Sequence, residues 1–258
     1  MAPRILICND DGIYAPGIMA LYEAVAGLGD LTVVAPEFEQ SAVGHAITIA
    51  DPIKIREISR SGGFSGYAVS GTPADCVKLA VTELLPDKPD MVISGINLGP
   101  NVGISVIYSG TVSGATEGAI LGIPSMAISV ASFKNPQWTT AARVARQMAR
   151  HVLEHGLPPD TLLNVNVPNR PPESIRGFRV TRMGRSRFAE VFHRRVNPRG
   201  DTYYWLDGEL QMLGDVHGTD VQAVDDNYIS LTPIWFDLSN AAAMEELRGW
   251  RLPWPPPD

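Results

Sequence analysis

The chain has 258 residues and a formal net charge of −7, with 45% hydrophobic and 19% charged residues. This is typical of a globular protein of one large or two modest domains, and the acidic balance argues against general nucleic-acid binding. The apolar, uncharged stretch 118–133 contains Gly and Pro and is shorter than the roughly 20 residues of a membrane span, and the N-terminus shows no secretion signal. We expect a cytoplasmic protein with neither a membrane nor a stable nucleic-acid partner.

Strand-like and helix-like segments alternate along the first two-thirds of the chain. Strands are predicted at residues 5–8, 31–35, 91–93, 126–130 and 162–167. Helices are predicted from residue 16 onward and at residues 74–85, 112–121 and 139–153. This alternation predicts parallel strands joined by crossover helices, and continuous apolar strands suit a sheet that is covered on both faces. Residues 53–58 alternate apolar and polar, which indicates a half-exposed strand at an edge or in a hairpin.

The character of the sequence changes after about residue 184. Residues 188–196 and 202–206 predict a β-hairpin with a turn-rich tip. Residues 176–199 carry eight Arg and one Glu, a local charge of +7 that, from a total of −7, leaves −14 on the rest of the chain. Such an arm is solvated, docks on the acidic body of a neighbouring subunit, or collects an anionic substrate. The tail at residues 253–258 is expected to be extended.

Asn9, Asp10, Asp11 and Gly12 directly follow the first predicted strand. In open α/β sheets, ligands bind at the carboxyl ends of the strands. Two carboxylates about 4 Å apart repel each other by roughly 4 kcal/mol at an effective dielectric constant near 20, and a bound cation turns this repulsion into attraction. The segment therefore predicts a metal site, and a solvated Asp-Gly turn is the alternative.

Three further polar clusters follow predicted strands or begin a predicted helix, at residues 39–45, 94–101 and 108–111. One topology brings all three to the sheet edge that carries the paired aspartates. Asp, Ser and Asn side chains offer only oxygen to a metal, which suits Mg²⁺, Mn²⁺ or Ca²⁺ and disfavours zinc. As alternatives, Ser41 is a loop hydroxyl bonded to nearby backbone and Asn97 is a turn former.

Ser109, Gly110 and Thr111 precede a predicted helix, and a helix N-terminus favours a phosphate. A plain helix cap is the alternative. His45 is either an acid or base near neutral pH or a structural histidine. The sequence contains no GxGxxG, GxxxxGK[ST] or GxSxG segment, so it gives little support to a dinucleotide oxidoreductase, a P-loop ATPase or a serine hydrolase.

Together these clusters resemble the signature blocks of the survival protein SurE family. The matching blocks are residues 9–17, 41–45, 71–77, 94–101 and 108–112, followed by residues 219–221 and 228–233 near the end of the chain. Members of that family are divalent-metal-dependent nucleotidases that remove phosphate from nucleoside monophosphates. The resemblance extends over essentially the whole chain.

The resemblance implies that one divalent cation per subunit, Mg²⁺ or Mn²⁺, is held by four residues, which are Asp10, Asp11, Ser41 and Asn97. It also implies an α/β, Rossmann-like fold with a mostly parallel sheet flanked by helices. The expected parts are a catalytic core at residues 1–184, a protruding β-hairpin arm at 185–215 and a C-terminal segment at 216–258 that returns to the core. The arm is expected to exchange between subunits of a homodimer or homotetramer.

We therefore expect a metal-dependent phosphomonoesterase that acts on nucleoside 5′-monophosphates, and by extension on 3′-monophosphates and short polyphosphate. Asp10 and Asp11 are the expected catalytic residues. The expected phosphate-binding and substrate-binding residues are Asn9, Gly44, His45, Asn101, Ser109, Gly110 and Thr111. Asp10 acts either as a metal ligand only or as a nucleophile through an aspartyl-phosphate. The alternative functions are a non-catalytic nucleotide sensor that uses the same loops and a structural partner protein that uses the basic arm.

Overall fold

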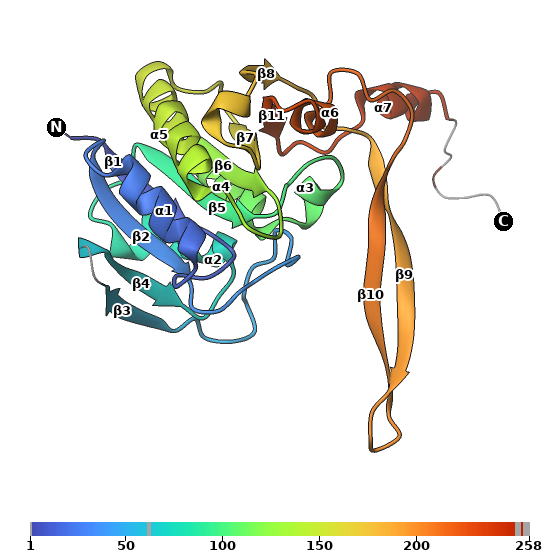
Figure 1. Ribbon diagram of the computed structural model, residues 1–258, viewed down its shortest axis with the longest axis horizontal. Coiled ribbons are helices and arrows are strands. Elements are labelled where there is room, and N and C mark those ends of the chain that lie inside the picture. Colours follow the sequence, from blue (N-terminus) through green and yellow to red (C-terminus); the bar gives the residue numbers. More distant parts are fainter. Residues whose placement is uncertain (1, 61–62, 251–253, 255–258) are drawn as a thin grey trace.

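The computed structural model describes residues 2–60, 63–250 and 254. It consists of a helix-covered sheet from which a long two-stranded hairpin projects (Figure 1). Apart from Trp254, the tail at residues 253–258 lies outside the described residues.

The central sheet has nine strands in the order β3-β4-β2-β1-β5-β6-β7-β11-β8. Their bounds are β1 Arg4–Cys8, β2 Asp30–Pro36, β3 Ile55–Ser59, β4 Ser65–Val69, β5 Met91–Leu98, β6 Ser125–Ala131, β7 Thr161–Pro168, β8 Phe178–Val180 and β11 Ile229–Trp235. Neighbours from β4 to β7 are all parallel, whereas β3 and β11 run antiparallel to β4 and β7. The expected mostly parallel, Rossmann-like α/β fold is confirmed. The half-exposed strand forms one edge of the sheet, as β3.

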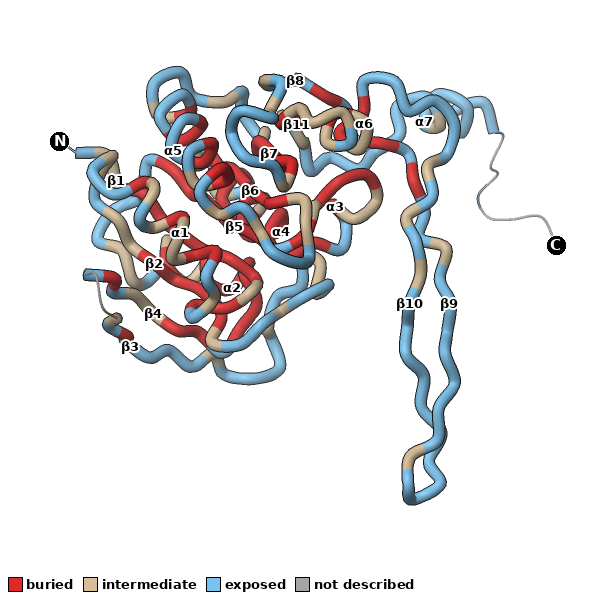
Figure 2. Tube along the Cα trace, in the orientation of Figure 1, coloured by how far each residue is buried: buried red, intermediate tan, exposed pale blue. Residues whose placement is uncertain are grey.

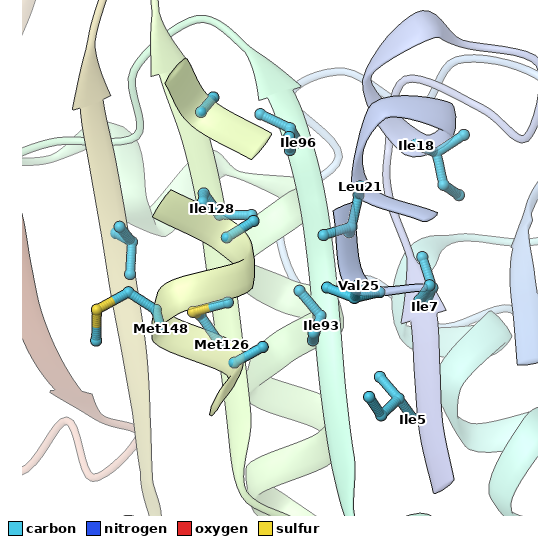
Figure 3. Close-up of a cluster of buried hydrophobic side chains, with 14 of the residues drawn as sticks. Ile5, Ile7, Ile18, Leu21, Val25, Ile93, Ile96, Met126, Ile128 and Met148 are labelled. Atoms are coloured by element: carbon cyan, nitrogen blue, oxygen red, sulfur yellow. The ribbon is translucent and has the colours of Figure 1, made fainter. Parts of the chain in front are cut away.

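Helices cover both faces of the sheet, which explains why its strands are apolar throughout. Helices α1 (Pro16–Val25) and α5 (Trp138–His155) contact each other over one face, and α2 (Pro73–Leu79) and α4 (Gly110–Ile120) do so over the other. Because side chains alternate along a strand, Ile5 and Ile7 of β1 join the cluster under α1 and α5 (Figure 3), whereas Leu6 and Cys8 join the cluster that contains α2 side chains.

Two predicted elements differ from the structure in their detail. The helix predicted at residues 74–85 begins at Pro73 behind the Thr72 cap, and its last part is a separate π-helical turn, η2 (Ala80–Leu84). Strand β5 continues past the predicted end at residue 93, so Asn97 lies inside the strand and not in a loop after it. Gly95 permits this continuation, since a Cβ there would lie 2.3 Å from the carbonyl oxygen of Ile128 on β6. The strand pairing shifts register between Ser94 and Asn97.

The hairpin is formed by β9 (Ser186–Val196) and β10 (Thr202–Met212). Both strands are longer than predicted, because their pairing continues to Met212 opposite Ser186. Most of its residues are exposed (Figure 2). The chain then forms α6 (Asp220–Asp225), adds β11 to the sheet and ends its described helices with α7 (Ala241–Arg248); the 3-10 turn η3 (Pro172–Ser174) and the short α3 (Ser105–Tyr108) complete the elements. Across residues 2–60 and 63–250, the helices are all too short or too polar to cross a membrane.

Candidate functional site

The candidate site lies where β1 and β5 run side by side. The chain places β2 on one side of β1 and β5 on the other, so the strand order reverses here and leaves a crevice at the carboxyl ends. A pocket of about 520 Å³ opens at this point. Five of the predicted site residues line it, namely Asp10, Ser41, Asn97, Asn101 and Ser109. The topology thus brings together residues from four separate segments of the chain.

Asp10 is held at the N-terminus of α4. Thr111 donates its hydroxyl hydrogen bond to Oδ1 of Asp10, and Ser109 caps the helix by accepting the N–H of Val112 at 3.0 Å. Gly110 lies against the same aspartate, because a Cβ at this glycine would sit 2.7 Å from the Asp10 Cβ. The positive end of the helix dipole, which we predicted to face a phosphate, therefore also faces the Asp10 carboxylate.

The paired carboxylates are electrostatically strained without a counter-ion. Burial raises the pKa of Asp10 above its ordinary value. Burial, followed by the negative charge of Asp10, raises the pKa of Asp11 to about 7. The N–H of Leu98 donates to Oδ2 of Asp11 at 3.2 Å and offsets only part of this cost. Asp11 is adjacent to the pocket but does not line it.

Neighbouring amides add oxygen atoms at the same edge. The Nδ2 group of Asn97 donates to the Gly99 carbonyl at 2.7 Å, which leaves its Oδ1 as the atom that can bind a ligand. Asn9 donates from Nδ2 to the Gly12 carbonyl at 2.9 Å, while its Oδ1 is buried without a hydrogen-bond partner. Two carboxylates and unpaired amide oxygens are the donor set of a hard divalent cation, so these residues fit Mg²⁺ or Mn²⁺.

Ser41 approaches the site on the loop that follows β2. Its hydroxyl donates to Oε1 of Glu39 at 2.5 Å, and the backbone N–H of Gln40 donates to the Asp10 carbonyl at 2.8 Å, which fastens this loop to the end of β1. Glu39 also contributes to the raised pKa of both aspartates. Sequence reasoning did not single out Glu39, although it belongs to the same polar cluster as Ser41.

Asn101 is fixed by a buried amide network. Its backbone N–H donates to Oδ1 of Asn166 at 2.8 Å, and its carbonyl accepts from the side-chain amides of Asn164 and Asn166. Its own Nδ2 donates to the hydroxyl of Ser129 at 2.9 Å. These bonds join the loop after β5 to β6 and β7 and hold the pocket wall in place.

Gly44 and His45 are not among the residues that line the pocket. The N–H of Gly44 donates to the carbonyl of Tyr108, a pocket residue, at 3.0 Å. The Nε2 atom of His45 lies 2.9 Å from Glu117, which also accepts from Lys78 at 2.6 Å. In this structure both residues therefore tie the 37–54 loop to α3 and α4.

The pocket also has an apolar wall that sequence reasoning missed. It is formed by side chains from the end of β5, from α3, from the loop after β6 and from the hairpin, namely Leu98, Tyr108, Phe133, Phe188 and Leu206, with Glu190 beside them. The alternation of side chains along the predicted hairpin strand could have indicated part of this wall, because it places residues 188 and 190 on the same face.

Comparison with known proteins shows the family of this chain. Residues 5–190 match the family model described as survival protein SurE. The chain belongs to the SurE family. It is 51% identical over 249 residues to a protein of Syntrophobacter fumaroxidans named 5′-nucleotidase SurE, a match that covers 96% of this chain and 100% of the relative.

Two further SurE proteins extend the comparison. A protein of Heliobacterium modesticaldum, also named 5′-nucleotidase SurE, is 49% identical, with 96% of this chain and 91% of the relative covered. The crystal structure of the SurE protein from Aquifex aeolicus superposes with a TM-score of 0.82 at 44% identity and covers 95% of this chain and 98% of the other. The fold of this chain is therefore that of a solved SurE protein over nearly its full length.

Proposed function

We propose that this chain is a 5′-nucleotidase, a divalent-metal-dependent hydrolase of nucleoside monophosphates. One observation supports this most directly. The buried Asp10 lines one pocket with Ser41 and Asn97 at the topological switch point of the sheet, and the half-buried Asp11 lies directly beside it. The names of the SurE relatives supply the reaction class, because those relatives are called 5′-nucleotidases.

Four side chains would hold one Mg²⁺ or Mn²⁺ ion, and they are Asp10, Asp11, Ser41 and Asn97. When bound, such an ion supplies charge to the phosphate oxygens and lowers the pKa of a coordinated water. The raised pKa values of the two aspartates support this assignment, since two negative charges in a poorly solvated site favour a cation.

The remaining residues bind and position the substrate in this proposal. Ser109 and Asn101 line the pocket and are suited to hold the phosphate. Gly110 and Thr111 hold Asp10, which with Asp11 orients the attacking water. Three further residues, Asn9, Gly44 and His45, support the phosphate-binding end of the site. They do so through hydrogen bonds that hold the loops after β1 and β2 in place. Positioning and charge stabilisation provide most of the rate of phosphoryl transfer.

Phosphate release from the purified full chain tests this function. The substrates are the four common nucleoside 5′-monophosphates, 3′-AMP and tripolyphosphate, each with Mg²⁺, Mn²⁺ or a chelator. We expect metal-dependent hydrolysis of the 5′-monophosphates and loss of turnover in Asp10→Asn and Asp11→Asn. Asp51→Asn, on an exposed loop, is the matched control. Full activity in chelator or in Asp10→Asn would contradict the proposal.

The sensor alternative and the nucleophile alternative need separate measurements. Calorimetry that detects nucleotide binding while the release assay detects no phosphate would identify a sensor. Rapid-quench experiments that trap a phosphorylated Asp10 would assign it as a nucleophile. We expect turnover without such an intermediate.

We also propose that the hairpin joins subunits in a homodimer or homotetramer. Apolar side chains along it are exposed in the single chain, including Phe192 at 64%, Tyr204 at 57% and Trp205 at 65%. Large exposed apolar side chains along an arm are typical of interaction surfaces. Light scattering coupled to gel filtration should give a dimer or tetramer mass, and Phe192→Ser with Trp205→Ser should lower it.

A further inference from the structure

We propose that the apolar wall of the pocket is a nucleobase subsite, an inference that rests on the nucleotidase function proposed above. In this subsite Phe133 and Phe188 stack on the base, and Glu190 selects a base that presents N–H donors, guanine above all. The polar part of the same pocket, at Asp10 and Ser109, holds the phosphate.

The hairpin base has a fixed position over the pocket. Asp220 accepts the N–H of Gly103 at 2.9 Å through Oδ2 and the N–H of Gly184 at 2.8 Å through Oδ1. The hydroxyl of Ser186, the first residue of β9, accepts the N–H of Ile104 at 2.8 Å. These bonds fasten the start of β9 to the loop that leads into α3, so Phe188 and Glu190 are anchored to the body of the protein.

Strand geometry directs the relevant side chains to one face. Phe188 and Glu190 are two residues apart in β9 and share a face. Leu206 lies on that same face, because it pairs with Phe192 in the antiparallel register. Gly208, opposite Glu190, leaves room for the Phe188 ring, since a Cβ there would lie 2.7 Å from its Cε1 atom.

Phe133 is placed by a second glycine. A Cβ at Gly99 would lie 2.3 Å from Cε1 of Phe133, so this ring packs directly on the backbone that follows Asn97. Phe133 is 73% exposed and Phe188 is 39% exposed, although both rings are held by packing. Two positioned, exposed aromatic rings beside a polar site are suited to a flat aromatic ligand. A nucleotide provides such a group beyond its phosphate.

Glu190 gives the subsite its expected selectivity. A carboxylate only accepts hydrogen bonds, and it repels the phosphate that the polar part of the pocket would bind. Its presence in the pocket is therefore best explained by donors on the other end of the substrate. The N1–H and N2 amine of guanine lie side by side and match the two carboxylate oxygens, whereas hypoxanthine lacks the amine.

Stacking is tested by comparing GMP with ribose 5-phosphate, which lacks the base but keeps the sugar and the phosphate. Phe188→Ala and Phe133→Ala should each lower kcat/KM for GMP about tenfold, within the range known for base stacking on aromatic side chains. Hydrolysis of ribose 5-phosphate should change by less than about twofold. Phe178→Ala, at an exposed phenylalanine of β8 outside the pocket lining and outside the hairpin, should leave the hydrolysis of both substrates unchanged.

Selection is tested by the ratio of kcat/KM for GMP to that for IMP, which cancels any effect of Glu190 on the phosphate. The unmodified protein should prefer GMP about tenfold, as for a good bidentate contact to a base edge, and Glu190→Gln should remove most of this preference. An unchanged ratio in Glu190→Gln would overturn the role of Glu190.

The outcomes separate this inference from the proposed function. Equal hydrolysis of GMP and ribose 5-phosphate by the unmodified protein would overturn the subsite and leave the nucleotidase function standing. An equal loss on both substrates in Phe188→Ala and Phe133→Ala would also overturn the subsite. Hydrolysis of neither substrate with Mg²⁺ or Mn²⁺ would overturn both proposals.

Discussion

Thr111 and Asp10 are joined by a hydrogen bond from the threonine hydroxyl to the Oδ1 atom of the aspartate. The two residues are 101 positions apart in the chain, and the bond connects the first turn of α4 to the loop after β1. The bond holds Asp10, the proposed metal ligand, in one orientation. Burial raises the pKa of Asp10, and the hydrogen bond from the Thr111 hydroxyl partly offsets that increase. The N-terminus of α4 thus acts as the support of the carboxylate.

Replacement of Thr111 by Val tests this support. The change removes the hydroxyl while keeping the shape, so Asp10 loses a hydrogen bond to a charged group, which is about 1.5 to 3 kcal/mol. We expect kcat/KM for AMP to fall by about tenfold to a hundredfold, with a higher Mn²⁺ concentration needed for half-maximal rate. Thr116→Val on the same helix, whose hydroxyl bonds to the Val112 carbonyl, is the control. Equal effects of the two variants would refute the support role.

Gly110→Ala tests the close contact on the other side of Asp10. The new Cβ would lie 2.7 Å from the Asp10 Cβ, so the aspartate must move. Misplacement of a reacting group by about 1 Å can cost about a hundredfold in rate, which is the loss we expect. Ala is also the better helix former, so the midpoint of thermal unfolding should not fall in parallel. A parallel loss of thermal stability would point to unfolding instead, and Thr116→Ala serves as the control.

Glu117→Gln is expected to change the pH dependence of stability. Burial acts to raise the pKa of Glu117, but hydrogen bonds from His45 and Lys78 outweigh it and leave the pKa below its ordinary value of 4.5. A lowered pKa gives stability that is complete above about pH 4.5 and is lost as the pH falls through the folded-state value.

The free energy of unfolding should therefore fall by about 1 to 3 kcal/mol at pH 7 in Glu117→Gln. The difference from the unmodified protein should shrink as the pH decreases below about 4.5. Urea unfolding at several pH values measures this difference in the free energy of unfolding. Glu83→Gln, at an exposed position, is the control. A difference that stays constant between pH 7 and pH 3 would show that the ion pairs do not contribute.

Asp220→Asn is expected to loosen the base of the hairpin. The carboxylate accepts backbone N–H groups from Gly103, Gly184 and Val221, and an amide would turn one acceptor into a donor that faces a donor. We expect a loss of about 1 to 3 kcal/mol in unfolding free energy and faster proteolytic cleavage near Arg185. Asp225→Asn on the same helix is the control. Unchanged cleavage at the hairpin base would argue against this anchoring.

The sequence alone was sufficient to predict the fold class, and it also gave the candidate metal-binding residues that we propose. Apolar runs such as Ile5 to Cys8 indicate strands covered on both faces, and polar residues directly behind them mark the ligand-binding edge. These features are local, because period and burial are determined by neighbouring residues in the chain. The family blocks around Asp10 and Asn97 then indicated the reaction class, and the family comparison confirmed the resemblance.

Tertiary structure alone decided which side chains meet. Thr111 holds Asp10, Glu117 binds both His45 and Lys78, and Phe133 and Phe188 share one pocket, yet each of these sets comes from elements far apart in the chain. It also placed Asn97 within β5, where Gly95 lets the strand continue against β6. Such contacts depend on crossover connections, strand register and close backbone approach, which the periodicity of a single segment does not specify.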